Sequence, residues 1–132
     1  MPVVSLPATL VATVLSFALG GLWYGPLFGK AWMEENGFTV ENLKRDFNPL
    51  KLYGITFIIS ALASYVFGMF LGPDPDLGFA VGAGLAAGVF WVAGSFATSY
   101  LFEGKTLRHF LINGGYHVVQ FGLIGLAFGV LG

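Results

Sequence analysis

Four polar side chains recur at helical spacing inside the last apolar stretch of the chain. They stand at i, i+3, i+4 and i+7 and are Asn113, Tyr116, His117 and Gln120. A helix places all four on one face, where amide, phenol and imidazole groups can bond to neighbouring helices. The imidazole adds a second chemistry, since an unperturbed histidine titrates at about pH 6.5.

Two interpretations of this face stay open. Polar groups in an apolar span need a partner or a water-filled path, so the face is expected to point into a bundle or between protomers. In the first interpretation, the face forms hydrogen bonds that hold the helices together. The second is a path for protons or a small solute, or a small-ligand pocket, completed by Ser60. That serine belongs to a hydroxyl stripe with Thr56 and Ser64, which is expected to meet the face.

Several chemistries lack the residues they require. The chain has no cysteine, and its apolar stretches hold no Asp, Glu, Lys or Arg apart from their ends. His109 and His117 stand eight residues apart without the usual third protein ligand of a zinc site. We therefore predict no catalytic residue, no metal site, no cofactor and no enzymatic activity.

The elements that carry these residues are predicted to span a membrane. Of the 132 residues 56% are hydrophobic and 10% charged, and the mean hydropathy is +0.79. Four apolar stretches, about 3–23, 52–71, 78–101 and 109–131, reach or approach the roughly 20 residues that cross a bilayer. We predict an all-α integral membrane protein whose four transmembrane helices form two hairpins within a single domain, 1–132.

The positive charges predict how the chain is threaded. All six lie in segments 25–51 and 102–108, whereas segment 72–76 carries only acids. The cations are Lys30, Lys44, Arg45, Lys51, Lys105 and Arg108. Because cationic loops resist translocation, both segments are expected in the cytoplasm and both termini outside. With a net charge of −1, the expected partners are membrane lipids and other membrane proteins rather than nucleic acid.

A short amphipathic helix is predicted in the first cytoplasmic loop. Val40, Leu43 and Phe47 stand at i, i+3 and i+7, Thr39 can cap the helix, and Pro49 stops it. Such a helix can anchor the loop at the membrane interface or dock a partner.

Small residues predict close helix packing. Gly84 and Gly88, like Gly125 and Gly129, stand four apart, a spacing that lets helices approach closely. Because the third span has more small faces than one neighbour can use, self-association through the third or fourth span is expected.

The segment 20–32 is the most distinctive part of the chain. Gly25 and Pro26 are expected to end or kink the first span, and Trp23, Tyr24 and Trp32 suit the aromatic belt of a membrane interface. Together with segment 113–116, this pattern resembles the DUF1761 family of small four-helix bacterial membrane proteins, whose function is undefined. The resemblance covers nearly the whole chain and implies a bacterial inner membrane.

Two functions are therefore predicted. The leading one is a structural or assembly bundle that self-associates or joins a larger membrane complex. The alternative is a small oligomeric channel or transporter lined by the polar face of the fourth helix.

Overall fold

A computed structural model describes residues 4–132, and within them the chain is helical and contains no strand. The elements are α1 (Leu6–Leu22), η1 (Trp23–Leu27), α2 (Gly29–Asn36), α3 (Val40–Asp46), α4 (Pro49–Leu71), α5 (Leu77–Ala86), η2 (Ala87–Ala93), α6 (Gly94–Glu103) and α7 (Leu107–Leu131). The two η segments are π-helical turns that continue the helix before them.

Four helical runs are long and apolar enough to cross a membrane: Leu6–Leu27, Pro49–Leu71, Leu77–Glu103 and Leu107–Leu131. The predicted all-α, four-span fold is thus confirmed, although residue 3, the expected start of the first span, lies outside the described residues. The second span begins three residues earlier than expected, at Pro49. The Asn48 side chain accepts from the Lys51 amide at 3.2 Å, and proline suits the first helical position.

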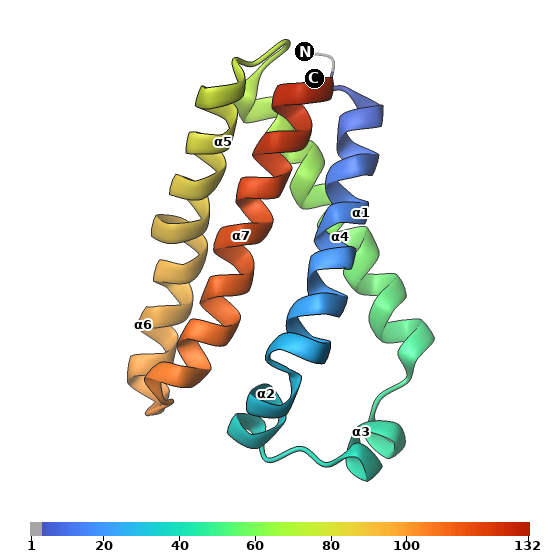
Figure 1. Ribbon diagram of the computed structural model, residues 1–132, viewed down its shortest axis with the longest axis vertical. Coiled ribbons are helices and arrows are strands. Elements are labelled where there is room, and N and C mark those ends of the chain that lie inside the picture. Colours follow the sequence, from blue (N-terminus) through green and yellow to red (C-terminus); the bar gives the residue numbers. More distant parts are fainter. Residues whose placement is uncertain (1–3) are drawn as a thin grey trace.

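Helix α7 lies at the centre of the molecule. The α5–η2–α6 run packs along one side of it and α1 along another (Figure 1). Helix α4 packs mainly on α1 and reaches α7 near Phe67, whose ring lies 5.7 Å from that of Phe121. Towards its first residues α4 runs away from both neighbours (Figure 1). Every residue of its first half, 49–59, is consequently exposed.

The core consists mostly of small residues. Ala8 and Ala12 of α1 are fully buried, together with Ile124 and the larger Phe128 of α7. A Cβ on Gly68 of α4 would lie 2.5 Å from the Phe128 ring, so glycine is what lets the two helices meet there. Large apolar side chains point outward instead, with Phe90 75% and Phe102 91% exposed. This inside-out distribution suits a lipid environment, where helix contacts rely on small residues.

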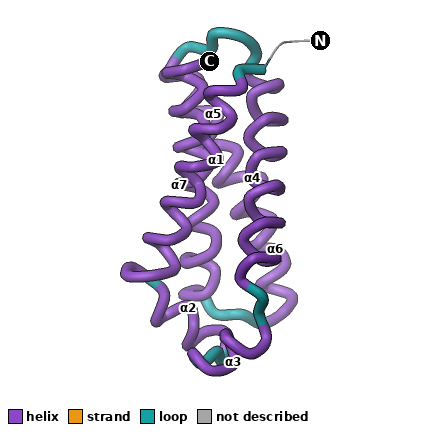
Figure 2. The backbone as a smooth tube through the Cα atoms, turned by 90° about the vertical axis from the view of Figure 1, so that its right-hand side faces the viewer, coloured by secondary structure: helices purple, strands orange, loops and turns teal. Residues whose placement is uncertain are grey.

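The loops gather at the two ends of the molecule (Figure 2). At one end, here called the terminal end, the Asp74 amide donates to the Gly132 carbonyl at 3.2 Å, and Ser5 donates to the Leu131 carbonyl at 3.4 Å. The opposite end holds α2, α3 and the α6–α7 turn, and with them all six Lys and Arg residues. We call it the basic end.

The turn η1 replaces a simple end to the first span. Pro26 has no amide hydrogen to donate, and the Phe28 amide bonds to the Trp23 carbonyl, five residues back, at 2.8 Å. The chain then turns into α2 at Gly29. A Cβ at that position would lie 2.5 Å from the Tyr24 carbonyl oxygen, so the turn requires glycine. The expected interruption at Gly25 and Pro26 therefore takes the form of a π-helical turn.

The predicted loop helix is α3. Thr39 caps it by accepting from the Asn42 amide at 3.2 Å, while the Asn42 side chain accepts from the Thr39 amide at 2.8 Å. Phe47 leaves the helix and lies 5.8 Å from the ring of Phe38, which in turn lies 5.3 Å from Trp32. This row of rings ties α3 to α2. The location of α3 at a membrane interface stays a prediction.

Candidate functional site

The polar face of α7 is held in register by an uninterrupted helix. Thr106 caps its start, with the Thr106 hydroxyl accepting from the His109 amide at 3.1 Å. Gly114 and Gly115 continue the helix and leave room for aromatic rings: a Cβ on either would lie 3.0 Å from Phe110 or Trp23, respectively. The face is therefore packed against a ring of its own helix, Phe110, and a ring of η1, Trp23.

Asn113 joins three spans through one side-chain amide. Its Oδ1 accepts from the Tyr24 hydroxyl of η1 at 2.7 Å, and its Nδ2 donates to the Tyr100 hydroxyl of α6 at 2.7 Å. One position earlier, the backbone carbonyl of Ile112 accepts from Trp23 Nε1 at 2.8 Å. The first and third spans are thus both bonded to the same turn of the fourth.

Tyr116 bonds one turn further along. Its hydroxyl donates to the Ser16 carbonyl of α1 at 2.9 Å. The ring packs beside Gly20, where a Cβ would lie at an ordinary contact distance of 3.6 Å from the Tyr116 hydroxyl oxygen. The rings of Tyr24 and Tyr116 lie 5.4 Å apart, so α1 and η1 hold this phenol on both sides.

His117 and Gln120 form a pair within α7. His117 Nδ1 lies 2.7 Å from Gln120 Oε1, and because that oxygen only accepts, the bond belongs to the tautomer whose Nδ1 carries the hydrogen. The imidazole stacks on Phe96 of α6 with centroids 5.3 Å apart. Gln120 is only 5% exposed. Throughout residues 4–132, no fully buried side-chain nitrogen or oxygen lacks a hydrogen-bond partner.

Ser60 lies apart from these bonds. Ser60 and Ser64 are buried in α4, and the Ser64 hydroxyl donates to the Ser60 carbonyl at 2.8 Å. Thr56 is exposed and donates to the Leu52 carbonyl at 2.7 Å. Among the described residues, no hydrogen bond joins these hydroxyls to the polar face of α7. Their expected meeting with that face, and a role for Ser60 in a path, stay predictions.

A further hydroxyl stripe was missed in the sequence. Thr9, Thr13 and Ser16 of α1 are buried. Each donates to the carbonyl four residues earlier, at 2.8, 2.8 and 2.9 Å. Their i, i+4, i+7 spacing is as regular as that of the α7 face and could have revealed them. Self-bonded hydroxyls let a polar sequence pack as a dry helix face.

The four predicted packing glycines lie between the third and fourth spans. A Cβ on Gly84 would overlap the Phe121 carbonyl, and one on Gly125 would overlap the Ala80 carbonyl. A Cβ on Gly88 would lie 2.7 Å from Val118 Cα, and one on Gly129 would lie 2.7 Å from Leu77 Cδ1. All four glycines thus serve contacts within one chain.

The expected interface anchors contact other parts of the protein. The polar atoms of Trp23 and Tyr24 bond to α7, as described above, and the half-buried Trp32 ring lies 5.6 Å from that of Tyr24. Their role in an aromatic belt stays a prediction.

A charged cluster at the basic end, also missed in the sequence, fastens α2 to α7. Arg108 Nε lies 3.0 Å from Glu35 Oε2, Arg108 Nη2 lies 3.2 Å from Glu34 Oε2, and the Thr106 hydroxyl donates to Glu35 Oε1. The hydrogen bond from Thr106, followed by that from Arg108, lowers the pKa of Glu35 below its ordinary value. We call these four residues the α2–α7 latch.

The described residues contain no group of three or more His, Asp or Glu side chains placed to hold a metal ion. Each of the four residues of the α7 face makes at least one hydrogen bond within the same chain.

The fold and this face define a multi-pass helical membrane protein whose central helix is hydrogen-bonded to its neighbours. The chain belongs to the DUF1761 family, described as a protein of unknown function, whose sequence pattern matches residues 7–129. The resemblance noted in the sequence is thereby confirmed. Neither the comparison with curated proteins nor that with solved structures found a match to this chain.

Proposed function

We propose that this protein is a membrane scaffold that acts by assembling with copies of itself or with a larger membrane complex. In this proposal the polar face of α7 serves to hold the helices of one chain together by hydrogen bonds. The observation that carries the proposal is the Asn113 amide, which uses both its oxygen and its nitrogen on phenols of two other spans at 2.7 Å. A side chain committed in this way holds the first and third spans to the fourth.

The proposed assembly surface is the first half of α4. Residues 49–59 are exposed on every side of the helix, including Leu50 at 85%, Ile58 at 59% and Ile59 at 60%. Gly84, Gly88, Gly125 and Gly129 were expected to support self-association, but they contact residues of their own chain. This half-helix is exposed along its length, with the Phe57 ring 5.4 Å from that of Phe17 on α1, and is the better place for a second copy.

The protein is proposed to lie in a bacterial inner membrane with both termini outside and loops 25–51 and 102–108 in the cytoplasm. This orientation is supported by the gathering of all six Lys and Arg residues at the basic end, against Asp74 and Asp76 in the α4–α5 loop at the terminal end.

The alternative is a small oligomeric channel or transporter lined by Asn113, Tyr116, His117 and Gln120. It is supported by His117, whose Nε2 has no hydrogen-bond partner among residues 4–132, so that one ring nitrogen is left to exchange protons.

One experiment distinguishes a structural role of the polar face from a role in conducting protons. Wild type, Asn113→Leu and His117→Leu are reconstituted into liposomes, and proton flux is measured together with thermal stability in detergent. The scaffold proposal expects no flux from any of the three and a lower stability for Asn113→Leu. Flux that His117→Leu abolishes at unchanged stability would establish the channel instead.

Assembly is tested by single cysteines, since the natural chain has none. Ile58→Cys on α4 and Leu10→Cys on α1 provide a matched pair, because the two side chains are 59% and 58% exposed. Oxidation in membranes should cross-link Ile58→Cys into dimers and leave Leu10→Cys monomeric. Equal cross-linking of both variants would contradict the α4 surface.

A further inference from the structure

A hollow lies between α6 and α7 at the basic end, outside the polar face described above. It is open to the outside and has a volume of about 270 Å³. Its lining includes Tyr100, Leu101, Lys105, Thr106, Leu107 and Phe110. The walls are thus mostly apolar, and a single cation stands among them.

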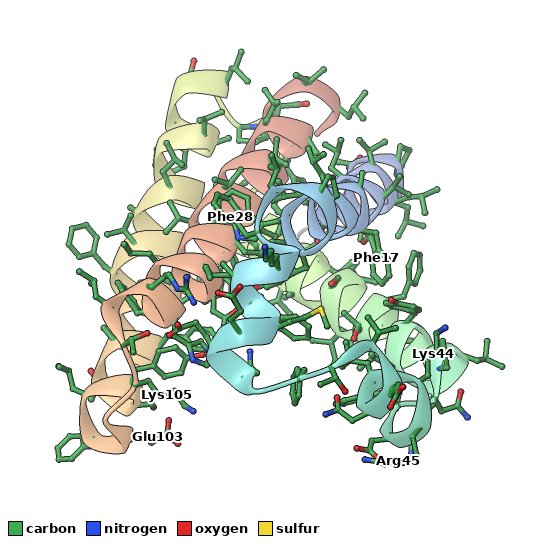
Figure 3. All side chains as sticks on the ribbon, turned by 60° about the horizontal axis from the view of Figure 1, so that its bottom comes forward. Phe17, Phe28, Lys44, Arg45, Glu103 and Lys105 are labelled. Atoms are coloured by element: carbon green, nitrogen blue, oxygen red, sulfur yellow. The ribbon has the colours of Figure 1, made fainter. Side chains whose placement is uncertain are left out.

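The charge of this hollow is positive. The Lys105 ammonium lies over the Tyr100 ring, 5.9 Å from its centroid, and no carboxylate lines the hollow. Glu103 is on the same turn (Figure 3), but within the described residues no ion pair joins it to Lys105. Glu35, which Thr106 contacts, is already paired with Arg108 at 2.8 Å. Lys105 is therefore available to an anion from outside the chain.

The start of α7 adds to this positive charge. Thr106 and Leu107, which line the hollow, are the N-cap and the first residue of a 25-residue helix. The amide groups of a first helical turn carry partial positive charge and favour anions. The Lys105 ammonium and the first turn of α7 thus both make the potential inside the hollow more positive.

Exposed leucines line the hollow, and a further one follows on α7 one turn beyond it. Leu101 is 82% exposed, Leu107 72% and Leu111 57%. A ligand that places an anion at Lys105 can therefore lay a hydrocarbon chain against these leucines. A free phosphate ion would use the charge and leave the apolar walls uncovered, whereas a phospholipid matches both.

We propose that the α6–α7 hollow binds the headgroup of an anionic phospholipid, with its phosphate at Lys105 and an acyl chain along Leu101 and Leu111. This inference rests on the helices spanning a membrane and is independent of self-association. The hollow lies well apart from Lys44 and Arg45 of α3 (Figure 3), so one lysine can be tested without changing that cluster.

A second hollow at the basic end supplies the control. It lies between α3 and α4 and includes Lys51 and Leu52, but its lining also includes Asp46. Lys51→Gln removes the same charge at the same end of the molecule and at the start of another spanning helix.

The test is native mass spectrometry of delipidated full-length protein in detergent, titrated with phosphatidylglycerol or phosphatidylcholine. Wild type should bind one phosphatidylglycerol more tightly than phosphatidylcholine. Lys105→Gln should lose about fivefold in affinity for phosphatidylglycerol, as expected for one basic residue at an anionic headgroup. Lys105→Arg should retain the binding, and Lys51→Gln should leave it unchanged. Millimolar glycerol 3-phosphate should not displace the lipid.

Three outcomes would overturn the proposal. Equal binding of both lipids means a lipid shell without headgroup selection, and an equal loss in Lys51→Gln means diffuse charge. Displacement by glycerol 3-phosphate means a phosphate site rather than a lipid site. The same spectra report the oligomeric state, so failure of the lipid site is distinguished from failure of the scaffold proposal.

Discussion

Gly84 lies so close to Phe121 that a Cβ at position 84 would overlap the Phe121 carbonyl oxygen. The contact is between backbones, so no side-chain rotation can relieve a substitution.

Gly84→Ala should therefore separate the third span from the fourth and lower the free energy of unfolding by about 1–3 kcal/mol, as for other overpacked cores. Gly82→Ala is the matched control, because a Cβ there meets nothing within 4 Å. Thermal unfolding in detergent measures both variants. If both changes lowered the stability equally, the need for glycine would come from the helix itself and not from the contact with Phe121.

The Asn113 bridge should be measurable as a coupling energy. Hydrogen bonds between membrane helices average about 0.6 kcal/mol and reach about 1.7 kcal/mol, so Asn113→Leu, which removes two, should cost about 1–3 kcal/mol. A double-mutant cycle with Tyr100→Phe isolates the hydrogen bond from Asn113 Nδ2 to the Tyr100 hydroxyl. Ser95→Ala is the control, because the Ser95 hydroxyl donates to the Trp91 carbonyl of the same span. Additive effects of Asn113→Leu and Tyr100→Phe would show that this bond contributes nothing.

The α2–α7 latch should make stability depend on pH. The pKa of Glu35 is lower in the folded protein than its ordinary value, so its contribution is complete above the ordinary glutamate pKa of about 4.3. The contribution is lost as the pH falls below that value through the lowered pKa. Melting temperatures measured from pH 7 to pH 3 should fall less steeply for Glu35→Gln than for wild type.

Arg108→Gln provides the reciprocal test of the latch, since it removes the partner and keeps the carboxylate. Its pH profile should also be flatter, and the double variant with Glu35→Gln should be no flatter than Glu35→Gln alone. A profile for Glu35→Gln that parallels wild type would mean that Glu35 does not stabilise the fold.

The turn between α1 and α2 should tolerate alanine at one glycine and not at another. Gly29→Ala places a Cβ 2.5 Å from the Tyr24 carbonyl, whereas a Cβ on Gly25 meets nothing within 4 Å. Only Gly29→Ala should disturb Tyr24 and so weaken its bond to Asn113. Intrinsic tryptophan fluorescence, measured with Trp32 and Trp91 replaced by phenylalanine so that Trp23 alone reports, should shift in that variant alone. A shift of the same size in Gly25→Ala would contradict the assignment.

The spans were predictable from the sequence because the hydropathy and length of an apolar stretch can be read without knowing what the stretch contacts. Each of the four apolar stretches became a helix whose ends lie within a few residues of expectation. The loop helix was also predictable, because Thr39 and Asn42 cap it from neighbouring positions. The turns η1 and η2 were not. The turn η1 depends on the close backbone approach of Gly29 to Tyr24, five residues earlier, which hydropathy does not encode.

The polar face of α7 followed from its spacing, but its partners did not. Asn113 bonds to tyrosines 89 and 13 residues away along the chain, and only the packing of helices brings them together. The latch was missed for the same reason, since Glu35 and Arg108 are 73 residues apart. The glycine spacing was recognised, yet a small-residue pattern is the same whether the neighbour is in the chain or in another copy.

The central position of α7 has a consequence for how the protein is made. Helix α7 contacts α1, α4, α5 and α6, and it is the last of the four spans to leave the ribosome. Tyr24 and Tyr100 are therefore synthesised before the amide that bonds both of them. Until the fourth span is synthesised, these two hydroxyls lack the partner that they have in the folded protein. The tertiary structure around α7 therefore forms only after synthesis of the fourth span.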